Sequence, residues 1–415
     1  MLLRYDNKPK TKVNTITLFY LLFWIFGIIP KGFQLVLFTI LAGFIIIKNG
    51  YYIRLKPTKA MFFLLTGICI QVIAIVWQLI VHEVDVSRTL ASINTVSIWL
   101  VGVFFYQYFY TISINKEYLI NIYKIVLFNL LILTLIYIFS LIYKDTSLFI
   151  LNYSLPLRHK DYMIGGGGYR FSGLLETQLA VSHMFLIFLP LLTLPPNNKK
   201  LKKITLVVAS FALITVLASH SRMGIISAIC CYLAFFWIIV FTDRFKKYDR
   251  MIILFSLIMG GIIVMLVKWT TLVKIASNFI YSRAGSNSAR TYIYRESIKK
   301  VLSENPLFGI GIKYFIGFSW ADIPYGSHST YIGLLYKAGI IGCIIYIIGF
   351  FFLLRRIWYI NKDLTIGYPL MIMILSYFLF LAFADIDGIN WVCIYAFATF
   401  GILSNNAYRK CQLSR

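Results

Sequence analysis

Long apolar runs of about 16–24 residues recur from one end of the 415-residue chain to the other. A helix of about 20 apolar residues crosses the hydrocarbon core of a bilayer, and it satisfies its own backbone hydrogen bonds there. Hydrophobic residues make up 60% of the chain and charged residues only 13%, a balance unlike that of a soluble domain. A transmembrane barrel would show short alternating segments instead. We therefore expect an all-α polytopic membrane protein, with residues 1–415 forming a single integral membrane domain.

About twelve transmembrane helices are predicted, and the sixth ends at Pro195-Pro196, which stop a helix. The predicted spans are 14–30, 32–47, 60–81, 90–112, 120–143, 178–195, 204–219, 223–242, 251–270, 330–354, 366–384 and 389–405.

Basic residues indicate how these spans are oriented. Most of the 40 lysines and arginines cluster in alternate segments between spans, while the short segments opposite are nearly free of them. By the positive-inside rule we expect both termini to be cytoplasmic. The protein would then lie in the cytoplasmic (inner) membrane, with 144–177 and 271–329 as large loops on its outer side. The net charge of +25 thus reflects topology, and we expect no nucleic-acid partner.

Metal-ligand patterns are weak. The six cysteines show no metal-ligand spacing. Asp385 and Asp387 have metal-like spacing, but in a tight turn between the last two spans we interpret them as structural or as residues that orient an acceptor.

Two arginines stand out at predicted outer turns. Arg170 follows four glycines in "GGGGYRFSG", and Arg222 follows His220 and Ser221 in the hairpin "ASHSRMG". An arginine at the membrane surface either anchors to lipid headgroups or holds a ligand, and a guanidinium suits a diphosphate because it can donate to two oxygens at once. His220 is more typical of an ordinary turn residue.

The segment 282–315 predicts an amphipathic helix at the membrane interface. Tyr294, Ile298, Val301 and Leu302 form an apolar stripe, and Pro306 marks the end. Ser288 is a plausible N-cap. Arg290 would then lie in the first turn, where the helix dipole disfavours a cation and favours an anionic ligand. The alternative is a basic helix on anionic lipid.

His328 lies in "YGSHST", immediately before an apolar run. A histidine can accept a proton near neutral pH, although a residue at this position can equally be an ordinary helix-start residue. Candidates for substrate contacts are Tyr325 and Ser329, which lie beside His328, and Ser221 in the hairpin "ASHSRMG".

The order of these motifs resembles the O-antigen ligase and polymerase superfamily of bacterial envelope glycosyltransferases. The resemblance covers about 165–345 and rests on motifs in a fixed order: Arg170 and Gly173, Ser221-Arg222, Arg290, "NPLFGIG", His328, and Gly339 with Gly342. Members often have Asn after the histidine, where this chain has Ser329. The resemblance implies a fold similar to GT-C glycosyltransferases, neither a metal nor a cofactor, and a glycan linked to undecaprenyl diphosphate as substrate.

On this resemblance His328 is expected to be the general base, and Arg170, Arg222 and Arg290 to bind the substrate diphosphate. A repeat-unit polymerase, making O-antigen or capsule, is favoured over a ligase that transfers glycan to lipid A-core. A chain-length regulator is a possible further partner beside membrane lipid. A lipid-linked oligosaccharide flippase is a third reading, which would require ionisable residues in mid-span and broken helices around a central site.

Overall fold

A computed structural model describes residues 15–48, 57–143, 147–150, 153–161, 168–193, 199–241, 284–317, 322–406 and 410. The predicted span 251–270 lies outside these residues. The helices are α1 Thr15–Leu21, α2 Phe23–Ile28, α3 Lys31–Lys48, α4 Lys59–Val81, α5 Val86–Thr111, α6 Lys116–Ile142, α7 Gln178–Phe188, the 3-10 helix η1 Leu189–Thr193, α8 Lys199–Ala218, α9 Arg222–Phe241, α11 Ala284–Glu304, α12 Thr330–Asn361, α13 Gly367–Leu381 and α14 Asn390–Leu403.

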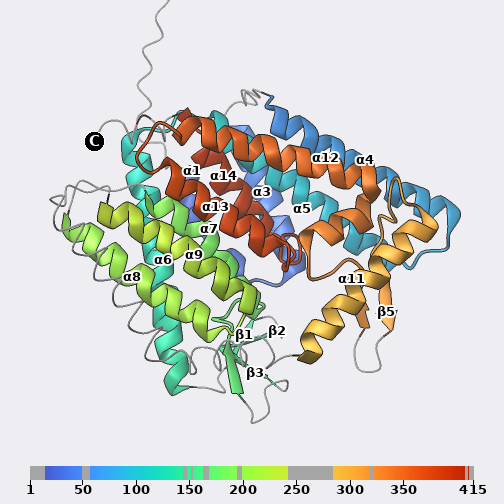
Figure 1. Cartoon of the computed structure of the whole chain (residues 1–415), viewed down its shortest axis with the longest axis horizontal. Coiled ribbons are helices and arrows are strands. Elements are labelled where there is room, and N and C mark those ends of the chain that lie inside the picture. Colours follow the sequence, from blue (N-terminus) through green and yellow to red (C-terminus); the bar gives the residue numbers. More distant parts are fainter. Residues whose placement is uncertain are drawn as a thin grey trace, which may run out of the picture.

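The described chain is mostly helical, as the apolar runs predict (Figure 1). Six of its helices are long and apolar enough to cross a membrane: α4, α5, α6, α8, α9 and α12. Shorter apolar helices match four further predicted spans, and the range 14–30 is divided between α1 and α2. The chain is therefore a multi-pass helical membrane protein.

The short apolar helices α7 and α14 form the centre of the molecule. Every residue of α14 is buried, as are all residues of α7 from Ala180 onward. A helix that is apolar on all sides must be enclosed by protein or lipid, and here protein encloses it. Around this centre α4 packs on α12, α5 on α14, α9 on α13, and α6 on α8.

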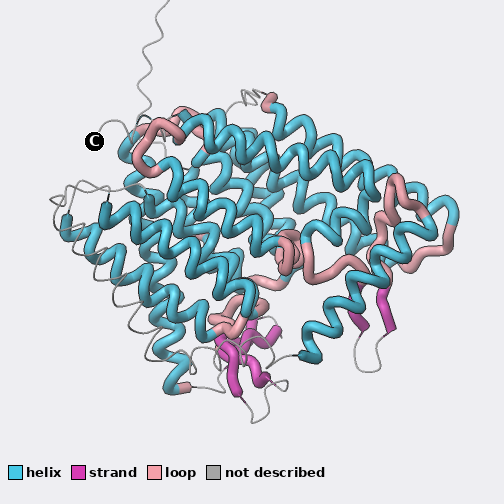
Figure 2. Tube along the Cα trace, in the orientation of Figure 1, coloured by secondary structure: helices cyan, strands magenta, loops and turns pink. Residues whose placement is uncertain are grey.

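Within the described residues, three antiparallel strand pairs interrupt the helical pattern, and the expectation of an all-α fold omitted them. β1 (Ser147–Ile150) pairs with β2 (Tyr153–Pro156), β3 (Arg158–Asp161) with β4 (Gly168–Phe171), and β5 (Phe315–Gly317) with β6 (Asp322–Pro324). All six strands lie in the two segments predicted as large loops. Figure 2 shows them along one edge of the molecule.

Helix α11 begins earlier than the sequence predicted. It already includes Ala284, so Ser288 lies inside the helix and is not its N-cap. Arg290 consequently belongs to the second turn, and the prediction that it opposes the dipole of a first turn is wrong. The helix ends at Glu304, just before Pro306, as expected.

Helix α12 is broken at Gly339, and the segment after α11 fills the break. Gly339 has φ 65° and ψ −169°, outside the helical range. The N–H groups of Ile310 and Gly311 donate to the carbonyls of Tyr336 and Lys337. In return, the N–H groups of Ile340 and Ile341 donate to the carbonyls of Pro306 and Leu307. The glycine-containing motif "NPLFGIG" (305–311) therefore supplies hydrogen-bond partners for the backbone groups that lack them at the break of α12.

Candidate functional site

His328 is held by its backbone between two elements distant in sequence. Its N–H donates to Oδ2 of Asp385 at 3.1 Å, and its carbonyl accepts from the Tyr294 hydroxyl at 2.7 Å. The residue adopts φ 65°, a conformation that costs a non-glycine residue about 1–2 kcal/mol. Hydrogen bonds on both sides stabilise this conformation, so His328 has a fixed position between α11 and the α13–α14 turn.

The start of α12 is tied to the same turn. Thr330 donates to the Ala384 carbonyl through both its N–H and its hydroxyl, and that hydroxyl accepts from the Ile386 N–H. Ser329 is buried and is the N-cap of α12, accepting from the Ile332 N–H. The first turn of α12 is therefore rigid where His328 precedes it.

A buried ion pair holds the other end of the turn. Asp387 accepts from the ammonium of Lys337 and from Nε1 of Trp99, the latter at 2.7 Å. Burial alone would raise the pKa of Asp387. The positive charges of Lys337 and Lys313 and the hydrogen bonds from Lys337 and Trp99 outweigh burial and lower that pKa to about 2. Asp387 is thus a carboxylate whose partners lie within the protein.

Arg222 and Arg290 approach each other from α9 and α11. Nη2 of Arg222 donates to Oδ1 of Asn287 at 2.5 Å, which joins the start of α9 to the first turn of α11. Arg290 is close enough to interact electrostatically with Arg222, Tyr294 and His328. Two guanidiniums and an imidazole therefore share one region, although they come from segments more than 30 residues apart.

The charges around His328 set its protonation. Burial lowers the pKa of His328 from its ordinary value, and the positive charges of Arg290 and Lys313 lower it further, while Asp385 opposes them. The net direction is downward, so the imidazole is neutral at pH 7 and can accept a proton. Burial also raises the pKa of Tyr294 to about 12, which keeps its hydroxyl a donor to the His328 carbonyl.

The remaining predicted residues lie in different settings. Arg170 is on β4, opposite His159 in the β3–β4 hairpin, an element separate from those that hold His328. Ser221 immediately precedes α9, and its carbonyl accepts from Ile225. The ring of Tyr325 stacks on Tyr336 with centroids 5.6 Å apart. Among the predicted charged or titratable site residues, Arg290 interacts electrostatically with both Arg222 and His328.

Asp385, Tyr294 and Asn287 complete this group. The sequence analysis interpreted Asp385 as structural or acceptor-orienting and Tyr294 as part of an apolar stripe, and it did not single out Asn287. Oδ1 of Asp385 is buried and has no hydrogen-bond partner within the described part of the chain. Tyr294 lies four residues after Arg290, so helical spacing could have joined the two. For Asp385, 57 residues beyond His328, no local spacing signals the contact.

Comparison with known families adds an independent observation. Residues 207–347 match the O-antigen ligase family. This range includes Arg222, Arg290 and His328. It also includes the segment 306–311 and the break of α12 at Gly339 that this segment fills. The match confirms the resemblance to the O-antigen ligase and polymerase superfamily that the ordered motifs predicted. Among curated proteins, none matches the chain.

Proposed function

We propose that this member of the O-antigen ligase and polymerase superfamily polymerises oligosaccharide repeat units linked to undecaprenyl diphosphate. The family match supports a glycosyltransferase of the ligase or polymerase type that acts on lipid-linked glycans. The observation that carries the proposal is the meeting of Arg222, Arg290 and His328 beside the partly buried carboxylate of Asp385, which accepts from the His328 N–H. Such a group can hold a diphosphate and remove a proton in the same place.

In the proposed reaction a hydroxyl of the acceptor glycan attacks the anomeric carbon of the donor glycan. The new glycosidic C–O bond forms as the bond from that carbon to the diphosphate oxygen breaks. His328 takes the hydroxyl proton, a contribution of about 10²–10⁴-fold. The departing undecaprenyl diphosphate keeps the bonding electrons, and Arg222 and Arg290 stabilise its charge, which is usually the largest single effect.

Other residues take secondary roles in this proposal. Asp385 holds the His328 backbone with Oδ2, and its Oδ1 is placed to orient the acceptor hydroxyl. Arg170 is a third candidate for diphosphate binding, while Ser221 and Tyr325 are candidates for glycan contacts. Ser329 acts through the helix cap that precedes α12.

The topology that we propose has twelve spans and resembles that of GT-C glycosyltransferases. Helices occupy eleven of the twelve predicted spans. The alternation of basic clusters supports cytoplasmic termini and an inner-membrane location. The segments 144–177 and 271–329 would then face the outer side, where the chemistry would take place. A chain-length regulator is a proposed partner.

Ligation is the second candidate, because the matched family is described as O-antigen ligase. The two reactions share their chemistry and differ in the acceptor, which is either another lipid-linked repeat unit or lipid A-core. A deletion strain separates them by the gel banding of its surface polysaccharide. Loss of a polymerase leaves one repeat unit on core, whereas loss of a ligase leaves bare core with accumulated lipid-linked polymer.

A flippase has one structural observation in its favour, since α12 is broken and carries the buried Lys337. The break is filled by the backbone of 306–311, however, and Lys337 is paired with Asp387. These groups are therefore already partnered, which supports a structural role over a transport site.

The central test is His328→Ala in cells, with protein amount measured by immunoblot. We expect polymer to disappear while the protein remains in the membrane. His82→Ala is the matched control, because His82 is an exposed histidine at the end of α4, and it should leave polymer at the normal level. Normal polymer from the His328→Ala protein would rule out the proposed mechanism.

A further inference from the structure

Four residues on α11 form a line that begins at a cation and continues as apolar side chains. Arg290, Tyr294, Ile298 and Leu302 are each four residues apart, so they follow one face of the helix. At 1.5 Å per residue, the line extends for about 18 Å.

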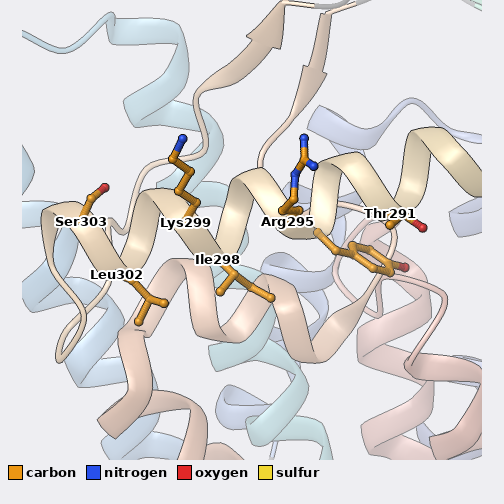
Figure 3. A pocket seen from close by; sticks show the side chains of 7 residues that line it. Thr291, Arg295, Ile298, Lys299, Leu302 and Ser303 are labelled. Carbon is orange, nitrogen blue, oxygen red and sulfur yellow. The ribbon is translucent and has the colours of Figure 1, made fainter.

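The two neighbouring rows of α11 have different surroundings. The row on one side, Ile293, Ser297 and Val301, is buried. The row on the other side is polar and consists of Thr291, Arg295, Lys299 and Ser303. An open space of about 970 Å³ lies along the surface of the helix, and all of its lining residues belong to α11: Thr291, Tyr294, Arg295, Ile298, Lys299, Leu302 and Ser303. Figure 3 shows Ile298 and Leu302 on one side of α11, with Arg295 and Lys299 extending from the other. The apolar line is therefore bordered by protein along one edge and by cations along the other.

This line is continuous with the candidate site. Tyr294 is its second member, and the same side chain donates to the His328 carbonyl. Arg290, its first member, interacts electrostatically with His328 and Arg222. At the far end Leu302 is 54% exposed, so an apolar ligand could cover it.

We propose that this line is the track for the isoprenoid chain of the lipid-linked donor. The inference rests on the proposed function, and it assigns the hydrocarbon chain a defined place on α11. With the diphosphate at Arg222 and Arg290, the chain would leave the site past Tyr294 and then cover Ile298 and Leu302. A ligand with an anionic head and a long apolar tail matches this order of a cation followed by apolar side chains.

Binding of diphosphate probes to the purified full chain tests the track without requiring turnover. Undecaprenyl diphosphate carries the long tail, whereas dimethylallyl diphosphate presents the same head with a tail too short to pass Tyr294. Native mass spectrometry gives both affinities for the wild type and for the Ile298→Ser/Leu302→Ser variant. We expect the preference for the long probe to fall roughly tenfold or more, because each lost apolar contact removes part of the burial free energy. Leu135→Ser on α6, which replaces an equally exposed leucine (54%), should keep the preference.

The outcomes separate this inference from the proposed function. An unchanged preference in the double variant, or an equal loss of affinity for both probes, would overturn the track. Loss of polymer in His328→Ala cells together with an unchanged preference would leave the transferase standing without the track. A photoreactive undecaprenyl diphosphate gives a second measurement on the wild type. Labelling of the peptide containing residues 294–302 supports the track, and labelling confined to other helices contradicts it.

Discussion

Gly309 and Gly339 approach each other so closely that a Cβ on Gly309 would lie 2.3 Å from the amide nitrogen of Gly339. Both glycines also have positive φ, 77° and 65° respectively. A side chain at either position would therefore meet backbone atoms and strain the backbone. The two Gly-containing motifs are halves of one joint, in which the segment after α11 enters the break of α12.

Gly309→Ala is expected to destabilise the protein by roughly 2 kcal/mol or more, because strain and steric conflict combine. Thermal unfolding of the purified protein measures the change. Gly43→Ala on α3 is the matched control, since a Cβ added there would have no neighbouring atom within 4 Å. There alanine should be neutral, or stabilising by up to about 1 kcal/mol. Equal stability of the two variants would contradict the joint.

The charges around His328 predict two opposite shifts in pH dependence. Asp385 favours the protonated imidazole and Lys313 disfavours it. Asp385→Asn should therefore lower the pKa of His328 further and move the acidic limb of the kcat/KM profile to lower pH. Lys313→Gln should raise the pKa and move that limb to higher pH. Because the wild-type pKa is already lowered from its ordinary value, the wild-type limb should lie below about pH 6.5. Limbs that do not move would exclude His328 as the titrating base.

Arg222→Lys distinguishes a two-oxygen contact from a simple positive charge. Lysine keeps the charge but loses the planar fork of the guanidinium. If Arg222 binds the diphosphate with both of its terminal nitrogens, the variant should lose about 10²-fold or more in kcat/KM, which corresponds to roughly 3 kcal/mol. Initial rates with lipid-linked repeat units measure the loss. The same change at Arg158, whose Nε donates to Ser140, serves as a control and should leave the rate nearly unchanged. Full activity of Arg222→Lys would reduce its role to charge alone.

Removing the charge from one member of the Lys337–Asp387 pair should lower the free energy of unfolding more than removing the charge from both. Asp387→Asn keeps an acceptor for Trp99 but leaves the Lys337 ammonium buried without its carboxylate. We expect a loss of about 3–5 kcal/mol in the free energy of unfolding. Adding Lys337→Met should restore most of this loss, and a double-mutant cycle of thermal unfolding measures the coupling. Additive effects would contradict a buried ion pair.

The helices were largely predictable, because the length and polarity of an apolar run are local properties of the chain. The boundaries of α4 and α12 agree at their starts within one residue of the predicted spans. The predicted start of α11 was wrong. Ser288 has the chemistry of an N-cap, but the residues before it, Ala284 to Asn287, already belong to the helix. A local signal cannot show which of two possible starts the tertiary structure selects.

The candidate site was predictable in part. Arg222 and His328 stood out because charged or titratable residues are rare in the short segments predicted on the outer side, and Arg290 stood out by its place in the predicted amphipathic helix. The contact of Asp385 with the His328 backbone could not be predicted, since it depends on how the α13–α14 turn packs against α12. The backbone hydrogen bonds between "NPLFGIG" and α12 join residues about 30 positions apart and are visible only in three dimensions.

The order of the two halves of the joint along the chain has a consequence for biogenesis. In a bilayer, each unpaired backbone group at the break would cost several kcal/mol. Residues 306–311 precede α12, so the ribosome completes the filling segment before it completes the helix that needs it. The joint thus suits assembly in the order of synthesis, and a chain lacking this segment should release α12 as a poorly inserted span that is open to membrane proteolysis.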